Sequence, residues 1–548
     1  LIDSYQILLS YLVKGAADPE RNKMYKSFER RAYELADMLE RAGDLQNDTS
    51  FYATSLRTLQ NLHGTQFTLS DLLQEGVNAR DIFDAIWLSG AWTVADETAV
   101  ANFMANREVI ENLKCLVLSA TTLSAMRYFD IAKYRVLLDN ALSDEIKIRV
   151  RALVGLIFVH IAHPERTLLY PEVSTRLRLM LDIPSFASQL ELLQSQLFLS
   201  LETKRIERNL QEEIIPQVMK RIEKLHIDRS LGLDEIKDKL SEADLNPEWE
   251  EDGRPSKLAQ YMHEFVELQE RGADMYMGSF KVLKQRFSFF NVVCNWFYPF
   301  TMNHPELPKG LSNIRMLKVL ISRTGLCDSD KYSFCLMTSQ MQNNIKADMQ
   351  EFMENAGALE MTDEVEKDLE FQFKDELRSY VQGFYRFCNL YLHHEEFFNP
   401  FQQNLFLADY VPFKQQLDDD DMLLRLADFV FKDKSFHMAL DLYHKLPQDK
   451  FTANVYQKIG YCYEQIGNAE NAINQYERAN LLKPHSKWTI KRLATCARST
   501  GNYKKALEYY TQLEEFLPED ADVAIHQAES LICMQRYDEA FKYLFKAN

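Results

Sequence analysis

The feature that most constrains this chain is a 34-residue period at its C-terminal end, which runs without an insertion from residue 453 to residue 548. Small residues occupy two positions of every period, namely Gly460, Ala494 and Ala528 at the first and Ala472, Ala506 and Ala540 at the second. Gly467 and Gly501 fall between these positions, where a turn between two helices favours glycine because its positive φ has no steric cost. Pro484 and Pro518 stop the second helix of each period. The period therefore predicts pairs of helices that cross closely at the small residues.

This pattern resembles the tetratricopeptide repeat (TPR) family, in which helix pairs of this length stack side by side. Full repeats are expected at 453–486 and 487–520, with a third at 521–548. A weaker copy at 420–452 is one residue shorter and carries Lys434 at the position of the turn glycine. The general layout resembles that of long bacterial TPR proteins. The resemblance implies a right-handed superhelical array of helix pairs, so the predicted fold is all-α, an α-solenoid.

The rest of the chain is also expected to be helical. It has only 17 glycines and 15 prolines in 548 residues, about half the usual share, whereas sheets need many such turn residues. Ile148-Arg149-x-x-Ala152 resembles the core of a HEAT-type repeat. The expected domains are a helical, partly HEAT-like region at 1–205, an irregular helical region at 206–415, and TPR-like repeats at 420–548.

The resemblance also implies a binding surface, because the first helix of each TPR lines a concave groove that holds a peptide. The groove residues expected here are Asn454, Gln457, Lys458, Tyr461, Trp488, Lys491, Arg492, Thr495, Arg498, Asp522, Ile525, His526 and Glu529. Chaperone-binding TPR domains carry a carboxylate clamp that begins with K-x-x-x-N, and Gln457-x-x-x-Tyr461 does not match it. Lys491-x-x-x-Thr495 does not match the later K-x-x-x-R part of the clamp. The expected partner is therefore a protein or peptide other than a chaperone C-terminus.

Charge is distributed unevenly along the chain. The net charge is −18, nearly all of it before the TPR-like repeats, which favours solubility and opposes a general attraction to nucleic acid or anionic lipid. Residues 478–505, by contrast, contain eight basic residues and no acidic one. This stretch is either a solubilising face or a site for an acidic peptide held by Lys491, Arg492 and Arg498. In the second case Trp488 would stack on the peptide.

Two histidine pairs are the candidates for a metal site. His160 and His163 lie three residues apart on an apolar stretch, and His393-His394 precede two glutamates. A catalytic zinc needs a third ligand and a nearby base, and the H-E-x-x-H motif is absent. Adjacent histidines on a helix also point about 100° apart. Structural roles are therefore favoured for both pairs, and no metal, cofactor or catalytic residue is expected.

Other conspicuous groups have structural interpretations too. Residues 287–300 contain seven aromatic side chains, which are expected to form core between helices rather than to line a pocket. Asn295 within this stretch needs partners if it is buried. The acidic run Asp418–Asp421 fits the positive end of the first TPR-like helix. The eight cysteines contain no C-x-x-C pair and are expected to be reduced core thiols of a cytoplasmic protein.

These observations favour a non-enzymatic protein–protein interaction scaffold or adaptor. The first alternative is an enzyme or enzyme subunit with a site in the 206–415 region. The second is an RNA-binding helical repeat that uses residues 478–505, which the net charge opposes. The longest apolar run, near Leu153 to Val159, is far shorter than the roughly 20 residues of a membrane span, so no membrane contact is expected.

The last helix of the period is amphipathic. Its apolar side includes Phe541, Leu544 and Phe545. In a solenoid that side is covered by the next repeat or by a capping helix. We therefore expect that either more chain or another molecule covers it, and self-association through this end is one such arrangement.

Overall fold

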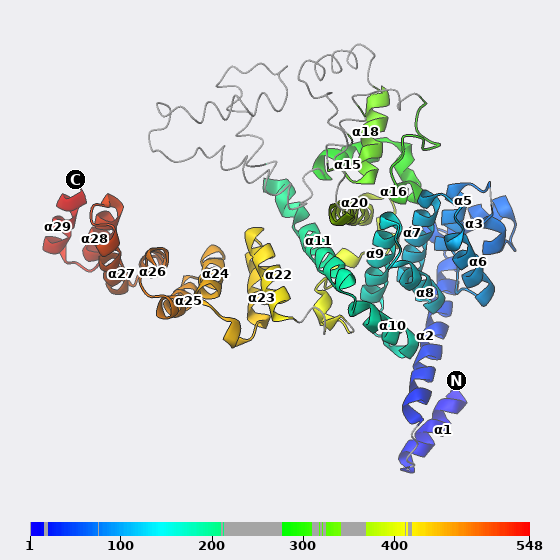
Figure 1. Cartoon of the computed structure of the whole chain (residues 1–548), viewed down its shortest axis with the longest axis horizontal. Helices are drawn as coiled ribbons and strands as arrows, with labels where there is room; N and C mark the ends of the chain where they lie inside the picture. Colours follow the sequence, from blue (N-terminus) through cyan, green and yellow to red (C-terminus); the bar gives the residue numbers. More distant parts are fainter. Residues whose placement is uncertain are drawn as a thin grey trace. The chain divides into compact units, whose positions relative to one another are not determined.

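The computed structural model describes residues 2–15, 20–74, 76–209, 277–309, 325–340, 369–411 and 419–547, together with positions 212, 317, 321, 413 and 414. All regular structure in these residues is helical, without a β-strand, so the prediction of an all-α fold is confirmed. The chain forms two compact units, at residues 1–414 and 415–548 (Figure 1). None of the described helices has the length and apolar character of a membrane span.

In the residues that the structure describes, the first unit consists of α-helices and short 3-10 turns. Its helices are α1 (Ile2–Val13), α2 (Arg21–Gln46), α3 (Phe51–His63), α4 (Leu69–Leu72), α5 (Ala79–Trp87), α6 (Val94–Ala105), α7 (Glu111–Arg127), α8 (Ile131–Asn140), α9 (Ile146–Ala162), α10 (Pro171–Leu181), α11 (Pro184–Asn209), α15 (Met277–Arg286), α16 (Val293–Phe297), α18 (Asp328–Gln340) and α20 (Leu369–Leu390). Short 3-10 turns are η1 (Thr167–Leu169), η4 (Ser288–Asn291), η6 (His394–Glu396), η7 (Pro400–Gln402) and η8 (Leu407–Asp409). The helix expected from the Ile148-Arg149-x-x-Ala152 pattern is present as α9.

The core of the first unit is centred on α9. Every residue from Val150 to Ile161 is buried, so this helix is enclosed on all sides. It packs on α7 and α8, its neighbours in sequence, and also on α20, which lies far along the chain. The buried Arg151 of α9 donates from Nη1 to Oε1 of Glu376 on α20 at 2.6 Å. The first unit therefore differs from a simple stack of helix pairs, because a distant segment closes its core.

The predicted division between residues 205 and 206 falls inside this unit. α11 packs on α20, and the Gln194 side chain of α11 reaches the backbone near η8. Its Nε2 donates to the Leu405 carbonyl at 2.9 Å, and its Oε1 accepts from the Leu407 N–H at 2.8 Å. Residues 213–276 lie outside the described residues, and the domain boundary between residues 205 and 206 stays a prediction.

The second unit is a succession of helix pairs, which Figure 1 shows in yellow to red. The pairs are α22 (Asp420–Lys432) with α23 (Phe436–Lys445), α24 (Ala453–Gln465) with α25 (Ala469–Leu482), α26 (Lys487–Ser499) with α27 (Tyr503–Phe516), and α28 (Ala521–Cys533) with α29 (Tyr537–Ala547). Each helix packs on the one before it and the one after it. α25 and α27 end just before Pro484 and Pro518, as the sequence predicts.

The same turn closes the first helix of every pair. Lys434, Gly467, Gly501 and Gln535 occupy it, with φ values of 60°, 82°, 75° and 62°. At each turn the N–H of the following residue donates to the carbonyl five residues earlier, as Asn468 does to Tyr463 at 2.8 Å. These bonds satisfy carbonyls that the end of a helix would otherwise leave open. Two of the four turns therefore adopt the glycine conformation without a glycine.

Small residues lie at the close helix crossings. Ala472, Ala506 and Ala540 are 0%, 0% and 2% exposed. Gly460 approaches Tyr476 so closely that a Cβ atom there would come within 2.7 Å of the ring. A larger side chain at these positions would have to displace the neighbouring helix.

Candidate partner-binding groove

One pocket opens among the first helices of the repeats. It has a volume of about 510 Å³ and is lined by Phe431 of α22, by Asn454, Gln457, Lys458 and Tyr461 of α24, and by Trp488 and Arg492 of α26. Six of these seven residues are among the groove residues expected from the sequence. The repeat register thus brings side chains from three helices to a single pocket.

Three aromatic rings contribute to this pocket. The ring centroids of Phe431 and Tyr461 lie 5.8 Å apart, and those of Tyr461 and Trp488 lie 6.3 Å apart. The Arg492 guanidinium lies over both the Tyr461 and the Trp488 ring, with Cζ 5.3 Å from each centroid. Trp488 is 42% exposed, whereas tryptophan is highly buried on average. A large part of its ring is therefore open to a partner.

An ion pair links the first helix of each repeat to the first helix of the next repeat. The pairs are Lys458–Asp428, Arg492–Glu464 and Arg498–Glu529, with N···O distances of 2.6, 3.0 and 2.8 Å. They link α22 to α24, α24 to α26, and α26 to α28 in turn. Three cations of the expected groove are thus neutralised by acids of the same chain.

Tyrosines from the second helices support two of these acids. Tyr443 Oη donates to Asp428 Oδ1 at 2.6 Å, and Tyr476 Oη donates to Glu464 Oε2 at 2.8 Å. Burial, and then the neighbouring carboxylate, raises the pKa of both tyrosines well above the ordinary value, so both remain protonated donors. Each carboxylate is held by a tyrosine and a cation together, which fixes the position of the cation.

The other expected groove residues lie outside the pocket. They are Lys491, Thr495 and Arg498 on α26, and Asp522, Ile525, His526 and Glu529 on α28. His526 Nδ1 lies 2.9 Å from Glu529 Oε2, so this histidine joins the Arg498 ion pair. Lys491 is exposed and forms no ion pair with a described residue. Of the three cations expected to hold an acidic peptide, Lys491 alone lacks such a partner in the described part of the chain.

Phe431 is the pocket residue that the sequence analysis missed. It stands at position twelve of the weaker repeat, the position that Glu464 and Arg498 occupy in the next two repeats. The repeat register could have placed Phe431 in the groove, although its helix belongs to the repeat that matches the period least well.

A hydrogen bond also connects α24 to α26 in the groove. Gln457 Nε2 of α24 donates to Thr489 Oγ1 of α26 at 2.7 Å.

The first histidine pair makes structural contacts. His160 is buried in α9 with Nδ1 3.0 Å from Thr167 Oγ1, and His163 has Nε2 3.1 Å from the Met126 carbonyl oxygen. Burial lowers the pKa of both imidazoles to about 4, so both are neutral at pH 7. Within the described residues no group of three or more His, Cys, Asp or Glu side chains is placed to hold a metal.

The second histidine pair belongs to a turn that holds the start of α3. The Glu396 carboxylate accepts from the backbone N–H groups of Phe51 at 2.7 Å and Tyr52 at 3.2 Å. The His393 ring stacks on Phe51 with a centroid distance of 4.6 Å. A carboxylate at a helix N-terminus satisfies amides that lack a helical partner and complements the helix dipole. These contacts give the motif a packing role.

The aromatic stretch and the acidic run take the positions expected for them. All the aromatic side chains of 287–300 except Phe300 are buried. Asn295 Nδ2 finds a partner in the Phe289 carbonyl at 2.9 Å. Asp419 is the N-cap of α22, where its Oδ2 accepts from the Met422 N–H at 3.0 Å; Asp418 lies outside the described residues.

The cysteines differ from the expectation at one position. All eight are free, and seven of them are buried. Cys533 is exposed instead of lying in the core, because it is the last residue of α28 and follows Ile532, which is also exposed.

Comparison with known proteins supports the repeat assignment. Residues 453–486 match the family model described as tetratricopeptide repeat. The uncharacterized protein ycf37 of Guillardia theta is 33% identical over 82 residues, which are 15% of this chain and 46% of ycf37, so the chain spans about half the length of this relative. The crystal structure of MamA protein aligns with a TM-score of 0.23 and 23% identity, over 25% of this chain and 74% of MamA. The crystal structure of the APC/C hetero-tetramer Cut9-Hcn1 aligns with a TM-score of 0.19 and 11% identity, over 98% of this chain and 88% of that one. Residues 453–486 thus match a tetratricopeptide repeat, and the same turn and close-crossing positions recur in the neighbouring helix pairs of the C-terminal unit.

Proposed function

We propose that this protein is a non-enzymatic scaffold or adaptor that holds a linear segment of a partner protein in the groove of its C-terminal repeats. TPR solenoids typically serve as protein-binding scaffolds. The observation that carries the proposal is the partly exposed Trp488 in a pocket that spans α22, α24 and α26. A large aromatic side chain in a well-supported pocket has the character of an interface hot spot.

The pocket suits a bulky apolar or aromatic side chain of the partner. Phe431, Tyr461 and Trp488 offer ring surfaces to such an anchor. The Arg492 guanidinium is held by Glu464 and lies over two rings, so it offers a flat, already neutralised surface. An anchor in this pocket gains stacking and hydrophobic energy without breaking an ion pair.

We place a carboxylate of the partner beside this anchor. Arg492 and Arg498 are each paired with an acid of the chain, so an acidic peptide gains little from them unless it displaces that acid. Lys491 lies one helical turn after Trp488 on α26 and is exposed. It can therefore receive a carboxylate directly. The proposed segment has one large apolar residue followed closely by an acidic one, rather than a long acidic run.

Replacing Trp488 with alanine tests this function. Tyr537 is a matched control, because it is an exposed aromatic residue on α29, outside the pocket. Wild type, Trp488→Ala and Tyr537→Ala would be immobilised, and the proteins that each captures would be quantified by mass spectrometry. We expect partners that wild type and Tyr537→Ala retain and that Trp488→Ala loses by about tenfold or more. Equal capture by all three folded variants, as judged by circular dichroism, would contradict the proposal.

Self-association through α29 is a second part of the proposal. Phe541 and Phe545 are 58% and 79% exposed. Burying these side chains against a second copy would remove a contiguous apolar surface from water. Light scattering should detect association of the wild type and its loss in Phe545→Glu. A monomeric wild type would remove this part of the proposal and leave the groove unaffected.

The two alternative functions have no supporting observation in the described residues. Much of the region considered for an enzyme site, including residues 213–276 and 341–368, lies outside them. In the basic stretch considered for RNA, Arg492, Arg498 and Lys505 each pair with an acid, which reduces the charge available to phosphates. The free cysteines support a reducing compartment, and we propose the cytoplasm.

A further inference from the structure

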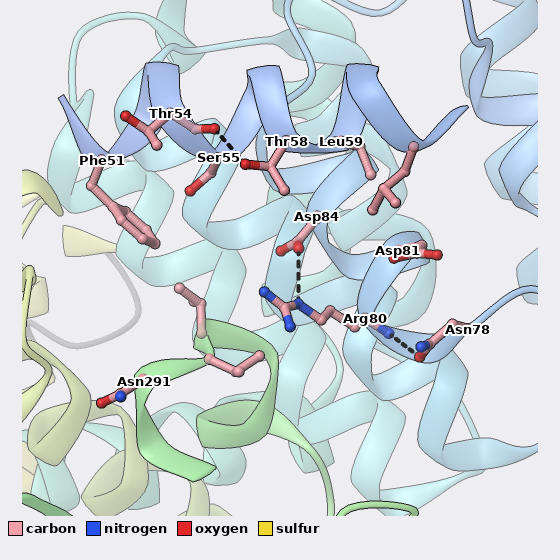
Figure 2. A pocket seen from close by; sticks show the side chains of 13 residues that line it. Phe51, Thr54, Ser55, Thr58, Leu59, Asn78, Arg80, Asp81, Asp84 and Asn291 are labelled. Carbon is pink, nitrogen blue, oxygen red and sulfur yellow. Dashed lines mark hydrogen bonds and ion pairs between the residues drawn. The ribbon is translucent and has the colours of Figure 1, made fainter. Parts of the chain in front are cut away.

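A second pocket lies in the first unit, and part of the aromatic stretch 287–300 borders it. It has a volume of about 500 Å³ and is formed by α3, α5 and the segment 291–293 at the start of α16. Figure 2 shows the side chains of Thr54, Ser55 and Thr58 on α3, and Asp84 and Arg80 of α5, which form an ion pair along one side of the pocket. The pocket therefore combines a charged side with a wall built by a helix.

The hydroxyl groups of this helix wall are mostly used within the helix. Thr54 Oγ1 donates to the Ser50 carbonyl and Thr58 Oγ1 donates to the Thr54 carbonyl, each at 2.9 Å. The rest of the wall is apolar, with Leu59 and Leu62 of α3 among its residues. Such a surface suits the alkyl part of a ligand rather than a polyhydroxylated one.

The charged side centres on Asp84. Its Oδ1 accepts from Trp87 Nε1 at 2.9 Å. Its Oδ2 lies 3.6 Å from Arg80 Nε, which is longer than a charge-assisted hydrogen bond of about 2.8 Å. Asp81, one turn away, has its Oδ2 3.1 Å from His63 Nε2. The pocket thus presents the Asp84 and Asp81 carboxylates to one guanidinium and one imidazole, and the Arg80 guanidinium is only a long partner of Asp84 Oδ2.

The environment of Asp84 shows that its negative charge is incompletely stabilised. Burial raises the pKa of Asp84 to about 6, although the indole hydrogen bond and the Arg80 charge lower it; Asp81 raises it further. Cys294 and Tyr391 are the other titratable groups near this carboxylate, and burial raises the pKa of both, so they are neutral at pH 7. At pH 7 Asp84 is therefore a partly buried anion that a further cation would stabilise.

We propose that this pocket binds an alkylammonium group, with the ammonium at Asp84 and the alkyl chain against Leu59 and Leu62. An ammonium supplies Asp84 Oδ2 with a shorter, charge-assisted N–H donor than Arg80 Nε at 3.6 Å, and it adds a cation beside the two carboxylates. The group can belong to a free primary amine or to a lysine side chain of another protein. This site lies in the first unit and is independent of the TPR groove.

Titration of the full chain with small probes tests this site. Ligand-observed NMR would compare n-butylamine, n-butanol and sodium butyrate at pH 7.5. We expect n-butylamine to bind at least about tenfold more tightly than the other two, because they lack a charged donor for Asp84. An alkylamine keeps its charge up to about pH 10, whereas Asp84 gains a proton below about pH 6. Butylamine binding should therefore weaken when the pH falls from 7.5 to 5. If the natural ligand is a lysine side chain, Nα-acetyl-lysine methylamide, which keeps its ε-ammonium, should bind more tightly than butylamine. If the natural ligand is a free amine, butylamine should bind more tightly.

Three variants make the test specific. Asp84→Asn keeps the shape of the side chain and the acceptor for Trp87, and it should weaken butylamine binding at least about tenfold. Asp144→Asn, an exposed acid of the same unit outside the pocket, should leave binding unchanged. Arg80→Ala removes the competing cation and should strengthen binding severalfold, the opposite of what a damaged fold would do. Equal binding of the three probes, unchanged binding by Asp84→Asn, or weaker binding by Arg80→Ala would overturn the proposal.

Discussion

The two units of this protein differ in the sequence separation of the contacts that stabilise each of them internally. In the C-terminal unit each helix packs on the helix before it and the helix after it. In the first unit, contacts between residues far apart in sequence close the core, as between Arg151 and Glu376, 225 residues apart, and between Phe51 and Glu396, 345 residues apart. A local contact that recurs leaves a period in the sequence, whereas a distant contact that occurs once leaves none. The units should therefore respond differently to single substitutions.

The largest effect is expected for Glu376→Gln in the first unit. Arg151 has a side chain that is 1% exposed and donates to Glu376 at 2.6 Å. Loss of the Glu376 charge leaves the buried Arg151 with only the longer ion pair to Asp328 at 3.6 Å, and it should cost about 3 kcal/mol of unfolding free energy. Hydrogen exchange should increase in both α9 and α20, and helices α24 to α29 should be unaffected. If the increase in hydrogen exchange is confined to the helical turn of α20 around residue 376, the Arg151–Glu376 pair does not help to close the core.

Ala506→Leu in the C-terminal unit is expected to have an intermediate effect. Ala506 is fully buried and packs in a cluster with Ala494 and Tyr510, so extra methylenes have no room and should cost about 2 kcal/mol. The melting temperature measures this cost. Ala521→Leu, at an exposed position at the start of α28, is the control and should change it little. A similar melting temperature for both variants would contradict the close crossing.

The smallest change in unfolding free energy is expected for Gln535→Gly, at the turn position that glycine occupies in other repeats. This substitution should stabilise the protein, whereas the two above should destabilise it. Gln535 has a φ of 62°, a conformation that costs a residue with a side chain about 1–2 kcal/mol. Gln535→Gly should therefore stabilise the last repeat by about 0.5–1 kcal/mol after the entropy of glycine is counted. Gln512→Gly, at an exposed position inside α27, should destabilise by about 1 kcal/mol. Urea unfolding distinguishes the two signs, and the same sign for both would refute the shared turn.

The fold of the C-terminal unit could be predicted because its restraints are local. The turn position, the small residues at the crossings and the prolines after the second helices follow from one period, and even Lys434 takes the conformation of its glycine counterparts. In the first unit the sequence indicated helices such as α9, but not that α20 would pack on it. No periodic pattern records a contact like that between Gln194 and Leu407, 213 residues apart.

Six of the residues that line the pocket among the first helices were expected in the groove, but the ion pairs of the groove residues were not predicted. Counting charges along residues 478–505 suggests a strongly basic surface. Arg492 and Arg498, however, pair with Glu464 and Glu529, which lie on neighbouring helices 28 and 31 residues away. A sum over a linear stretch cannot include these acids. The pocket formed by α3, α5 and the segment 291–293 had no sequence signal. Arg80, Asp81 and Asp84 have the pattern of surface residues in the sequence, and only the fold brings the segment 291–293 beside them.

The measurement that tests the central claim most directly is site-specific photo-crosslinking of the captured partner. A photoreactive phenylalanine would replace Thr495, one turn after Lys491 on α26, or Lys504, an exposed lysine at the start of α27. The account predicts crosslinks from position 495 to a short partner segment that contains a large apolar residue and an acid, and few crosslinks from position 504. Equal crosslinking from both positions, or crosslinking from position 504 alone, would contradict the claim that the TPR groove holds the partner.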